Sequence, residues 1–375
     1  MRKVFFDGTH RVRRPEHTWA LVEPLLPRFG VTRIADITGL DVIGVPVATS
    51  VRPLAKSLSV SQGKGRTPLL AKISAAMEAI ELWHIEHVRG PVLFAGTPAR
   101  ELELGYAVTD LVTAPSALVT DATALDWAGA TGLVTGRAVP VPSALVSFAG
   151  HSERRWSPPG LRSDSNGLAS GNSLAEAALH ALYEVIERDA LSRYHEPESL
   201  DLTSIPDEGC QDLVDKVVSA GATLTVAPIP NRFGVPCFDA RIWSPDFAIG
   251  CQGSGAHLDP AVALSRAITE AVQSRLTAIA GSRDDLPPIY HRVEIGAEEP
   301  PRPAERLVGW GGFGAEAAGP FEDLDTELAW IGKLTQQVTG FEPLVTDLST
   351  RPEFAVVKVI VPGTVVDEER VHPSR

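Results

Sequence analysis

The sequence predicts an α/β protein in which helices pack on largely antiparallel sheets. One observation is an internal repeat: a β-prone segment with Val-Pro occurs at Val45–Pro46, Val139–Pro140 and Val235–Pro236. Each copy continues into a second apolar stretch, a Gly-rich segment and an Ala/Leu-rich helix that carries acidic or polar residues. Such repeated order indicates repeated supersecondary units. The other observation is the run FAVVKVIV at residues 354–361, which is typical of a strand buried on both faces.

The N-terminal 50 residues contain the basic stretch Arg11–Arg14 and a short Pro-interrupted helical segment near Thr18–Pro27. The repeat units are expected at about residues 43–90, 138–195 and 234–280, with Gly-rich loops at Ser61–Gly65, Asn166–Gly171 and Gly250–Gly255. From the last loop Gly to the first acid of the helix the separation is 13 residues in two copies and 15 in the third. The middle copy carries an extra polar insertion, HSERRWSPPGLRSD. We interpret 1–375 as a single domain of strand–Gly loop–helix repeats.

Helix ends can be read from their capping residues. Thr67 can cap a helix that has Pro68 at its first position, and Asp259–Pro260 repeats this pattern. Ser173 and Glu176 have the spacing of a capping box. After a Pro/Gly-rich loop at 298–320, the C-terminal α/β segment at 320–375 begins with a helix over Asp325–Thr339, which Gly340 ends.

Composition excludes several classes of protein. The chain has 375 residues, and Lys+Arg 34 against Asp+Glu 47 gives a net charge of −13. That charge opposes non-specific nucleic-acid binding. No apolar run approaches the roughly 20 residues of a membrane span, and the N-terminus has no secretory apolar stretch. Three widely spaced Cys without a CxxC pair argue against a disulfide framework or a structural zinc site, so we expect a cytoplasmic protein.

Paired carboxylates are the first chemical signal. Glu78 with Glu81, and Glu184 with Glu187, are i,i+3 pairs on one face of a helix, and Glu176 lies on the same stripe as the second pair. Carboxylates that crowd together repel one another unless a cation lies over them, and magnesium is the usual one. The alternative is a solvated helix face with local ion pairs, and for Glu176 a capping role alone is sufficient.

Lys64 is the second signal, because it lies between Gly63 and Gly65 at the start of a helix. Backbone N–H groups, an ammonium and a helix N-terminus can together approach a phosphate. The spacing is not that of a Walker A loop, and a plain turn is the alternative. No GxSxG, HExxH or GxGxxG motif is present, and we interpret His84 and His87 as helix-surface or boundary residues. Together with the acids, Lys64 predicts a site for a Mg-nucleotide.

The motifs taken together resemble the YcaO family over about residues 8–361. The segments that carry the resemblance are SQGKG at Ser61, SAAMEAIE at Ser74, NGLASGN at Asn166, EVIERD at Glu184 and EAVQSR at Glu270. The resemblance implies a YcaO-like fold and an ATP- and Mg²⁺-dependent enzyme. Such an enzyme phosphorylates the oxygen of a peptide backbone amide, a nucleophile adds to the carbonyl carbon, and phosphate leaves with the oxygen.

The resemblance also implies residue roles. The magnesium-binding acids are Glu78, Glu81, Glu184 and Glu187. The residues expected to contact nucleotide are Arg11, Thr18, Lys64, Asn172, Glu176, Arg188, Glu270 and Arg275. The residues expected to take part in catalysis are Lys64, Arg188 and Gln273.

The product depends on the branch of the family. Residues after Val361 lack the Pro-x-Pro-x-Pro tail of azoline-forming members, and we expect this polar segment to fray or lie on the surface and to be dispensable beyond Asp367. The segments GTHR at Gly8, GVTRIA at Gly30 and TGLD at Thr38 resemble the tail-less branch that works with a TfuA-type partner and forms thioamides. Azoline or macrocyclic amidine formation, as in bottromycin-type pathways, is the alternative.

A non-catalytic nucleotide-binding scaffold is the alternative of another class. The intact acids in all three repeats favour catalysis, because a scaffold has no need of crowded charges. The expected partners are a precursor peptide or protein, with a TfuA-type protein or a separate leader-binding protein. Nucleic acid and membrane are not expected, and a homodimer is left open.

Overall fold

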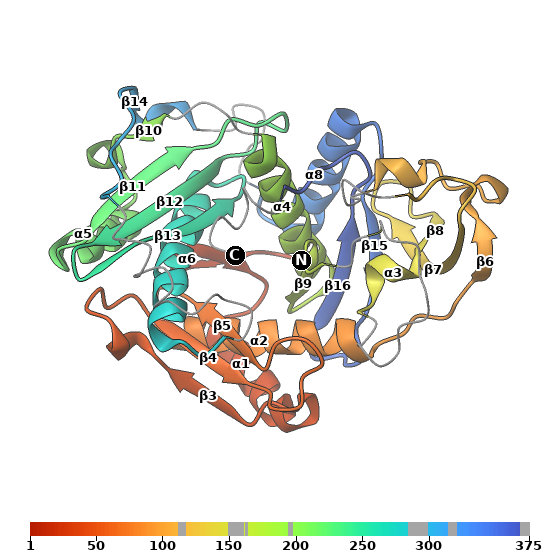
Figure 1. Cartoon of the computed structure of the whole chain (residues 1–375), viewed down its shortest axis with the longest axis horizontal. Coiled ribbons are helices and arrows are strands. Elements are labelled where there is room, and N and C mark those ends of the chain that lie inside the picture. Colours follow the sequence, from red (N-terminus) through yellow and green to blue (C-terminus); the bar gives the residue numbers. More distant parts are fainter. Residues whose placement is uncertain are drawn as a thin grey trace. The chain divides into compact units, whose positions relative to one another are not determined.

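The computed structural model describes residues 1–111, 118–148, 161, 164–193, 198–283, 299–313 and 321–367 (Figure 1). The chain forms two compact units. The first comprises Met1–Lys3, Ile80–Asp189 and Phe321–Asp367, and the second comprises Val4–Ala79, Ala190–Pro320 and Glu368–Arg375. Helices α2 (Pro68–His87) and α4 (Leu174–Arg193) each contribute residues to both units. The assignment of one domain to 1–375 stays a prediction.

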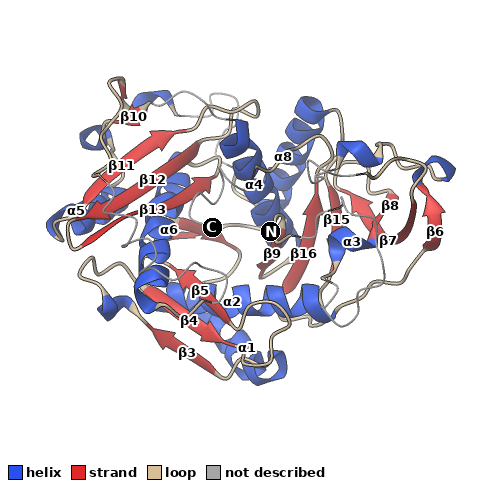
Figure 2. Ribbon diagram, viewed as in Figure 1, coloured by secondary structure: helices blue, strands red, loops and turns tan. Residues whose placement is uncertain are grey.

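The first unit is built on one six-stranded antiparallel sheet (Figure 2). Its strand order is β6–β7–β15–β16–β9, and β8 pairs with β7. Its elements are β6 (Phe94–Pro98), η3 (Ala99–Glu101), η4 (Val108–Asp110), β7 (Ala124–Gly132), β8 (Ala138–Pro142), α3 (Ser143–Val146), β9 (Leu168–Gly171), α8 (Leu324–Thr339), β15 (Leu344–Asp347) and β16 (Ala355–Ile360).

Two predictions for the first unit are confirmed. The apolar run at 354–361 forms β16, which lies between β15 and β9 and is buried from Ala355 to Val359. Helix α8 begins at an Asp323 cap and ends at Gly340, whose φ of 85° is the left-handed conformation that glycine adopts most easily. Tyr183 of α4 donates a 2.5 Å hydrogen bond to buried Glu327 of α8, so these two helices are fixed to each other.

The second unit places helix α6 between two antiparallel three-stranded sheets, β3–β4–β5 and β11–β12–β13 (Figure 1). Its strands are β1 (Val4–Phe6), β2 (Thr9–Arg11), β3 (Arg33–Asp36), β4 (Val47–Val51), β5 (Val60–Lys64), β10 (Ser199–Leu200), β11 (Thr223–Pro228), β12 (Cys237–Ser244), β13 (Phe247–Ala256) and β14 (Leu307–Val308). Its helices are α1 (Pro15–Val22), η1 (Glu23–Phe29), η2 (Thr38–Leu40), η5 (Leu202–Ser204), α5 (Glu208–Ser219), α6 (Pro260–Ala280) and η6 (Trp310–Gly312).

The core of the second unit follows from the alternation of its strands. Phe238, Ala240 and Ile242 of β12 point to the same side and pack with the apolar faces of α5 and α6. Burial of such contiguous apolar surface is the main stabilising contribution. Thr67 accepts from the Leu70 N–H at 3.3 Å and Asp259 accepts from the Ala261 N–H at 2.9 Å, so both predicted helix starts are confirmed.

The predicted Gly-rich loops are mostly strands, which corrects the sequence interpretation. SQGKG lies largely in β5, GCQGSG in β13, and the end of NGLASG in β9. The glycines are needed there because a helix crosses each strand at very short distance. A Cβ on Gly63 would lie 1.9 Å from the Ala75 nitrogen, and one on Gly253 would lie 2.1 Å from the Ala271 nitrogen. The glycines therefore serve close backbone packing.

The same contacts correct the alignment of the repeats. Gly63, Gly171 and Gly253 meet the nitrogens of Ala75, Ala177 and Ala271, so these pairs are structurally equivalent. The connections from Gly to Ala then have different lengths, 12, 6 and 18 residues. Counting residues from the last loop glycine to the first acid assumes that these connections have equal lengths in all copies. In consequence Glu176 and Glu270 are equivalent to each other, directly before the Ala, whereas Glu78 and Glu184 occupy different helical positions.

The middle copy departs further from the other two. In the first and third copies Val-Pro directly precedes a strand that pairs with the next one, β4 with β5 and β12 with β13. In the middle copy Val139–Pro140 lies inside β8, which pairs with β7, while β9 pairs with β16. Most of the polar insertion between β8 and β9 lies outside the described residues.

Gly63→Ala is expected to lower the free energy of unfolding by about 3 kcal/mol or more, because the new Cβ would force the backbones of β5 and α2 apart. Gly39→Ala is the matched control, since no atom lies within 4 Å of a Cβ there. Urea unfolding of the purified variants measures both effects. Equal stability of the two variants would contradict the close-packing explanation for Gly63.

Residues after Val361 are better ordered than the sequence suggested. Gly363 donates a 2.6 Å hydrogen bond to the Asp110 carbonyl, and Val365 donates a 2.9 Å bond to the Asp189 carboxylate. Pro362 and Thr364 are buried. The expectation of fraying is therefore wrong for residues 362–365, because backbone hydrogen bonds compensate for the small apolar area. The segment beyond Asp367 lies outside the described residues.

Candidate active site

Glu81, near the C-terminal end of α2, is held by the second repeat. Its Oε1 accepts hydrogen bonds from the Ser170 N–H at 2.8 Å and from the Ser170 Oγ at 2.5 Å. Bonds to an ionised acceptor are shorter and stronger than neutral ones. The structure therefore joins two predicted motifs, the acidic helix of the first repeat and the NGLASG segment of the second.

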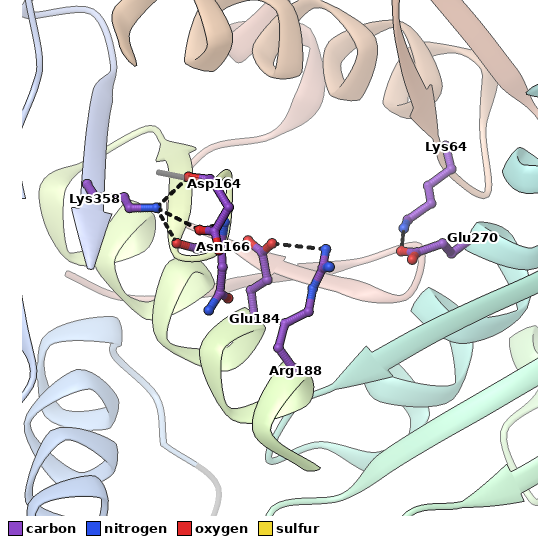
Figure 3. Close-up of polar contacts among 7 residues, drawn as sticks. All are labelled: Lys64, Asp164, Asn166, Glu184, Arg188, Glu270 and Lys358. Carbon is purple, nitrogen blue, oxygen red and sulfur yellow. Dashed lines mark hydrogen bonds and ion pairs between the residues drawn. The ribbon is translucent and has the colours of Figure 1, made fainter. Parts of the chain in front are cut away.

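Helix α4 carries the second set of predicted residues. Glu184 pairs with Arg188 at 3.3 Å (Figure 3). Glu187, one turn away from Glu184, is buried. These acids lie on a helix whose neighbouring positions are apolar, so their charges are concentrated in one place. A carboxylate that is buried and close to another one is stabilised by any cation that approaches it.

At the start of α4 the capping box forms only in part. Ser173 Oγ accepts from the Glu176 N–H at 3.2 Å, as expected. The Glu176 carboxylate reaches Asn172 instead of the cap residue, and it accepts from the Asn172 backbone at 3.2 Å and from its side-chain amide at 2.9 Å. Capping thus accounts for the geometry of Glu176 and Asn172, and their nucleotide contacts stay a prediction.

In the second unit Lys64 and Glu270 form an ion pair (Figure 3). Lys64 ends β5 and Glu270 lies on α6, so the pair links the first and third repeats. Glu78 lies nearby: burial raises its pKa to about 7, against the lowering effects of Arg283, Lys64 and a hydrogen bond from the Gln62 backbone. Glu78 is therefore poised to change its charge near neutral pH.

Asp239 is a site candidate that the sequence analysis missed. It lies on β12 on the face opposite Phe238, and its Oδ2 accepts from Arg241 at 3.3 Å. Burial raises its pKa to about 6, against the effects of Arg241 and Gln252, and Glu270 raises it further. The available signal was an Asp in the β-prone run CFDARIW, where a buried strand rarely accepts a charge.

The raised pKa of Asp239 predicts a pH dependence of stability. Asp239 binds its proton more tightly in the folded protein than in the unfolded chain, so its contribution to stability is greatest below the unfolded pKa of about 4 and is lost as pH rises through 6. At pH 8 the ionised group costs about 2 to 3 kcal/mol. Asp239→Asn should remove that cost.

Denaturant unfolding of Asp239→Asn at pH 4 and pH 8 checks this expectation. We expect the variant to gain stability over the parent protein at pH 8 and to match it at pH 4. Asp246→Asn is the control, because Asp246 is exposed and should leave the pH dependence unchanged. Parallel pH curves for the parent and Asp239→Asn would contradict the assignment.

Other predicted residues are placed as follows. Arg275 is buried and forms a two-pronged ion pair with Asp41, with Nε–Oδ2 at 2.8 Å and Nη2–Oδ1 at 3.2 Å. Gln273 is partly buried on α6, and its carbonyl accepts from Thr277. In the N-terminal part, Arg11 donates to the His10 carbonyl at 3.2 Å, and the Thr18 hydroxyl donates to the carbonyl of Arg14, just before α1, at 3.4 Å. The nucleotide roles of these residues stay predictions.

The expectation for His84 is wrong. It is fully buried, and its ring nitrogens lie 2.7 Å from the Ile80 carbonyl and 2.8 Å from the Thr350 hydroxyl. The spacing of residues along α2 does not show that the chain near Thr350 packs against His84, so this burial could not be predicted from the sequence. Cys210, Cys237 and Cys251 are buried.

Among the described residues, no three His, Cys, Asp or Glu side chains gather closely enough to form a metal site by themselves. Within the same residues, every helix falls short of the length and apolar character that crossing a membrane requires.

A sequence profile described as YcaO cyclodehydratase, ATP- and Mg²⁺-binding, matches residues 62–365. The chain belongs to the YcaO family. This membership confirms the resemblance stated from the motifs, and with it the dependence on ATP and Mg²⁺ that characterises the family.

Relatives of this YcaO protein come from bacteria and archaea. It is 42% identical over 289 residues to the uncharacterized protein Rv1375 of Mycobacterium tuberculosis. This match covers 76% of this chain and only 66% of the length of that relative. It is 36% identical over 389 residues to an uncharacterized protein in the tfuA 3′ region of Rhizobium leguminosarum bv. trifolii, covering 96% of this chain and 90% of the relative.

The fold is also that of a solved YcaO structure. YcaO from Methanopyrus kandleri, bound with AMPPCP and Mg²⁺, superposes with a TM-score of 0.73 at 24% identity, over 100% of this chain and 98% of that one. The predicted class, helices on largely antiparallel sheets, is confirmed, and β10 with β14 is a parallel pair among antiparallel ones.

Proposed function

We propose that this YcaO protein activates a backbone amide of a peptide or protein with ATP and replaces the amide oxygen by sulfur, which gives a thioamide. The observation that carries the choice of product is the relative in a tfuA 3′ region, which is similar over almost the whole chain. The N-terminal segments that resemble the TfuA-associated branch support the same choice. We therefore also propose a TfuA-type protein as the partner that supplies sulfur.

The chemistry balances with ATP as the only source of energy. The amide oxygen attacks the γ-phosphorus, ADP leaves, and the amide becomes an O-phosphorylated imidate after loss of its N–H proton. Hydrosulfide adds to the carbonyl carbon, phosphate leaves with the original oxygen, and the nitrogen regains its proton. The protein contributes by holding the two reactants in register and by offsetting the charge on the transferred phosphoryl group.

The acids of α2 and α4 have the donor chemistry that Mg²⁺ requires. Glu81, Glu184 and Glu187 offer carboxylate oxygens, which are the ligands this hard cation prefers. Mg²⁺ in nucleotide sites usually takes one or two carboxylates and completes its shell with phosphate oxygens and waters. We assign these three, with Glu78, to the metal of the Mg-nucleotide, which polarises the phosphates when bound.

The cations and amides are assigned to the nucleotide. Arg188 offers a planar guanidinium to a phosphate when Glu184 turns to the metal, and Lys64 offers an ammonium when it separates from Glu270. Each ion pair keeps its cation in position, and the cation must leave its carboxylate partner before it can bind a phosphate. The remaining assignments are Arg11, Thr18, Asn172 and Glu176 to the nucleotide and Gln273 to catalysis. The guanidinium of Arg275 is held by Asp41.

Intact-mass analysis of candidate substrate peptides tests the proposal. Each peptide is incubated with the enzyme, ATP, Mg²⁺, sulfide and the TfuA-type partner, and a parallel reaction omits sulfide. Exchange of O for S adds about 16 Da, whereas cyclodehydration removes about 18 Da. A loss without sulfide would replace our proposal by azoline or amidine formation. Unchanged peptide mass together with tight Mg-ATP binding would favour the scaffold role.

A further inference from the structure

Lys358 is a charged residue in the middle of an otherwise apolar buried strand. It is 3% exposed and lies in β16, where its neighbours Val357 and Val359 are equally buried. Taking an ammonium out of water opposes folding, and a buried ion pair is often no better than an apolar pair of the same shape. A position that only had to be filled would be met by Met or Leu. The charge therefore calls for an explanation.

The ammonium holds the turn that precedes β9. Its three N–H donors reach the Asn166 carbonyl at 2.6 Å, the Asp164 carbonyl at 2.7 Å and the Asp164 carboxylate at 3.4 Å (Figure 3). The next residue of the strand, Val359, donates a 2.7 Å bond to the Gly167 carbonyl. Gly167 is at φ +73°, and a Cβ there would lie 2.2 Å from the Val359 oxygen. Two successive residues of β16 thus fix the turn 164–167.

This turn leads directly to residues of the candidate site. β9 follows it, and Ser170 of β9 is the residue that binds Glu81. The charge of Lys358 also acts on α4: burial lowers the pKa of Lys358, Asp164 and Glu184 raise it, and Arg188 lowers it. Since electrostatic attraction is mutual, the positive charge of Lys358 also attracts the carboxylate of Glu184. Figure 3 shows the side chains of Lys358, Asp164, Glu184 and Arg188 in this part of the unit.

We propose that Lys358 is a positioning residue of the candidate active site, which holds the turn 164–167 with its hydrogen bonds and offsets the negative charge of α4 while no metal ion is bound. This inference rests on the proposed function, because its consequence is that the charge of Lys358 affects how tightly the candidate site binds Mg²⁺. A fixed positive charge beside Glu184 competes with a divalent cation, and a fixed negative charge favours it.

Two substitutions change the net charge at this place in opposite directions. Lys358→Gln keeps N–H donors for the turn but removes the positive charge, so the Mg²⁺ concentration that half-saturates AMPPCP binding should fall about threefold or more. Asp164→Asn keeps the bonds of Lys358 to the two carbonyls but removes its counter-charge, so the half-saturating concentration should rise by a similar factor. Calorimetric titration of Mg²⁺ at fixed AMPPCP measures both.

A purely structural role predicts a different pattern. If Lys358 only held the turn, both variants would weaken Mg²⁺ binding or leave it unchanged, and either result overturns the inference. Lys358→Arg, which preserves the charge, should stay within about twofold of the parent protein. If Lys358→Gln does not fold, an unchanged or lower half-saturating concentration for Asp164→Asn still contradicts the proposal. Failure of the parent protein to bind Mg-AMPPCP would overturn the proposed function as well.

Discussion

Glu187→Gln should reduce ATP-dependent turnover by about 100-fold or more, which corresponds to about 3 kcal/mol of lost transition-state stabilisation. The side chain is 9% exposed and lies on α4 one turn from Glu184, where a neutral amide of the same shape replaces an anionic ligand. Mg-ATP affinity, measured by calorimetry, should fall along with turnover. The remaining acids do not replace the negative charge that the Mg-nucleotide site loses with the Glu187 carboxylate.

The fold should be unaffected by this substitution. Removing one of several neighbouring negative charges relieves repulsion, so the Tm of Glu187→Gln should equal or exceed that of the parent protein. Glu101→Gln is the matched control in the same unit, because Glu101 is exposed and outside the predicted motifs. Parent-like Mg-ATP affinity of Glu187→Gln would remove Glu187 from the metal site, whereas a large drop in Tm would make the loss of turnover uninformative.

Local chemistry made many of the element boundaries predictable. Thr67, Asp259 and Gly340 satisfy backbone groups of their own helix, so the evidence for each cap lies within a few residues of sequence. The same holds for β16, because a continuous β-prone apolar run has few alternatives to a buried strand. The family followed from several short motifs in fixed order, although no single motif was specific.

The glycines show where such local reasoning fails. GKG and GSG have the composition of loops, yet these segments are strands whose glycines allow a helix to approach. A glycine in the sequence shows that no Cβ is present, but it does not show whether the position needs glycine for a turn or for the close approach of another backbone. The alignment of the acids between repeats was wrong for a related reason. The helix packs on its strand in the same way whatever the length of the connection, so counting residues along the connection does not find equivalent positions.

Residues explained by distant partners were the hardest to predict. His84 is buried by Thr350, and Lys358 is compensated by Asp164, nearly 200 residues away. Asp239 lies in a strand that reads as ordinary core. Spacing along the chain reveals which residues share an element, but it does not reveal what covers that element. Buried charges are therefore the candidates that only the three-dimensional structure adds.

Arg275→Gln should lower the free energy of unfolding by about 3 to 5 kcal/mol, because it leaves the buried carboxylate of Asp41 without its cation. The guanidinium binds Asp41 with two nitrogens and lies 4.9 Å from the centre of the Phe247 ring, so charge and packing are lost together. Denaturant unfolding measures the loss. Arg302→Gln, at an exposed position, is the control that should change little.

The same variant separates two roles for Arg275. Its motif predicted a nucleotide contact, whereas the structure gives it a partner on η2's C-terminal flank that already uses Nε and Nη2. If its role is structural, the folded fraction of Arg275→Gln should bind Mg-ATP as the parent protein does, and Asp41→Asn should show a comparable loss of stability because it breaks the same pair from the other side. A parent-like unfolding free energy combined with a loss of Mg-ATP affinity would reverse this conclusion, and it would place the Arg275 guanidinium at the nucleotide.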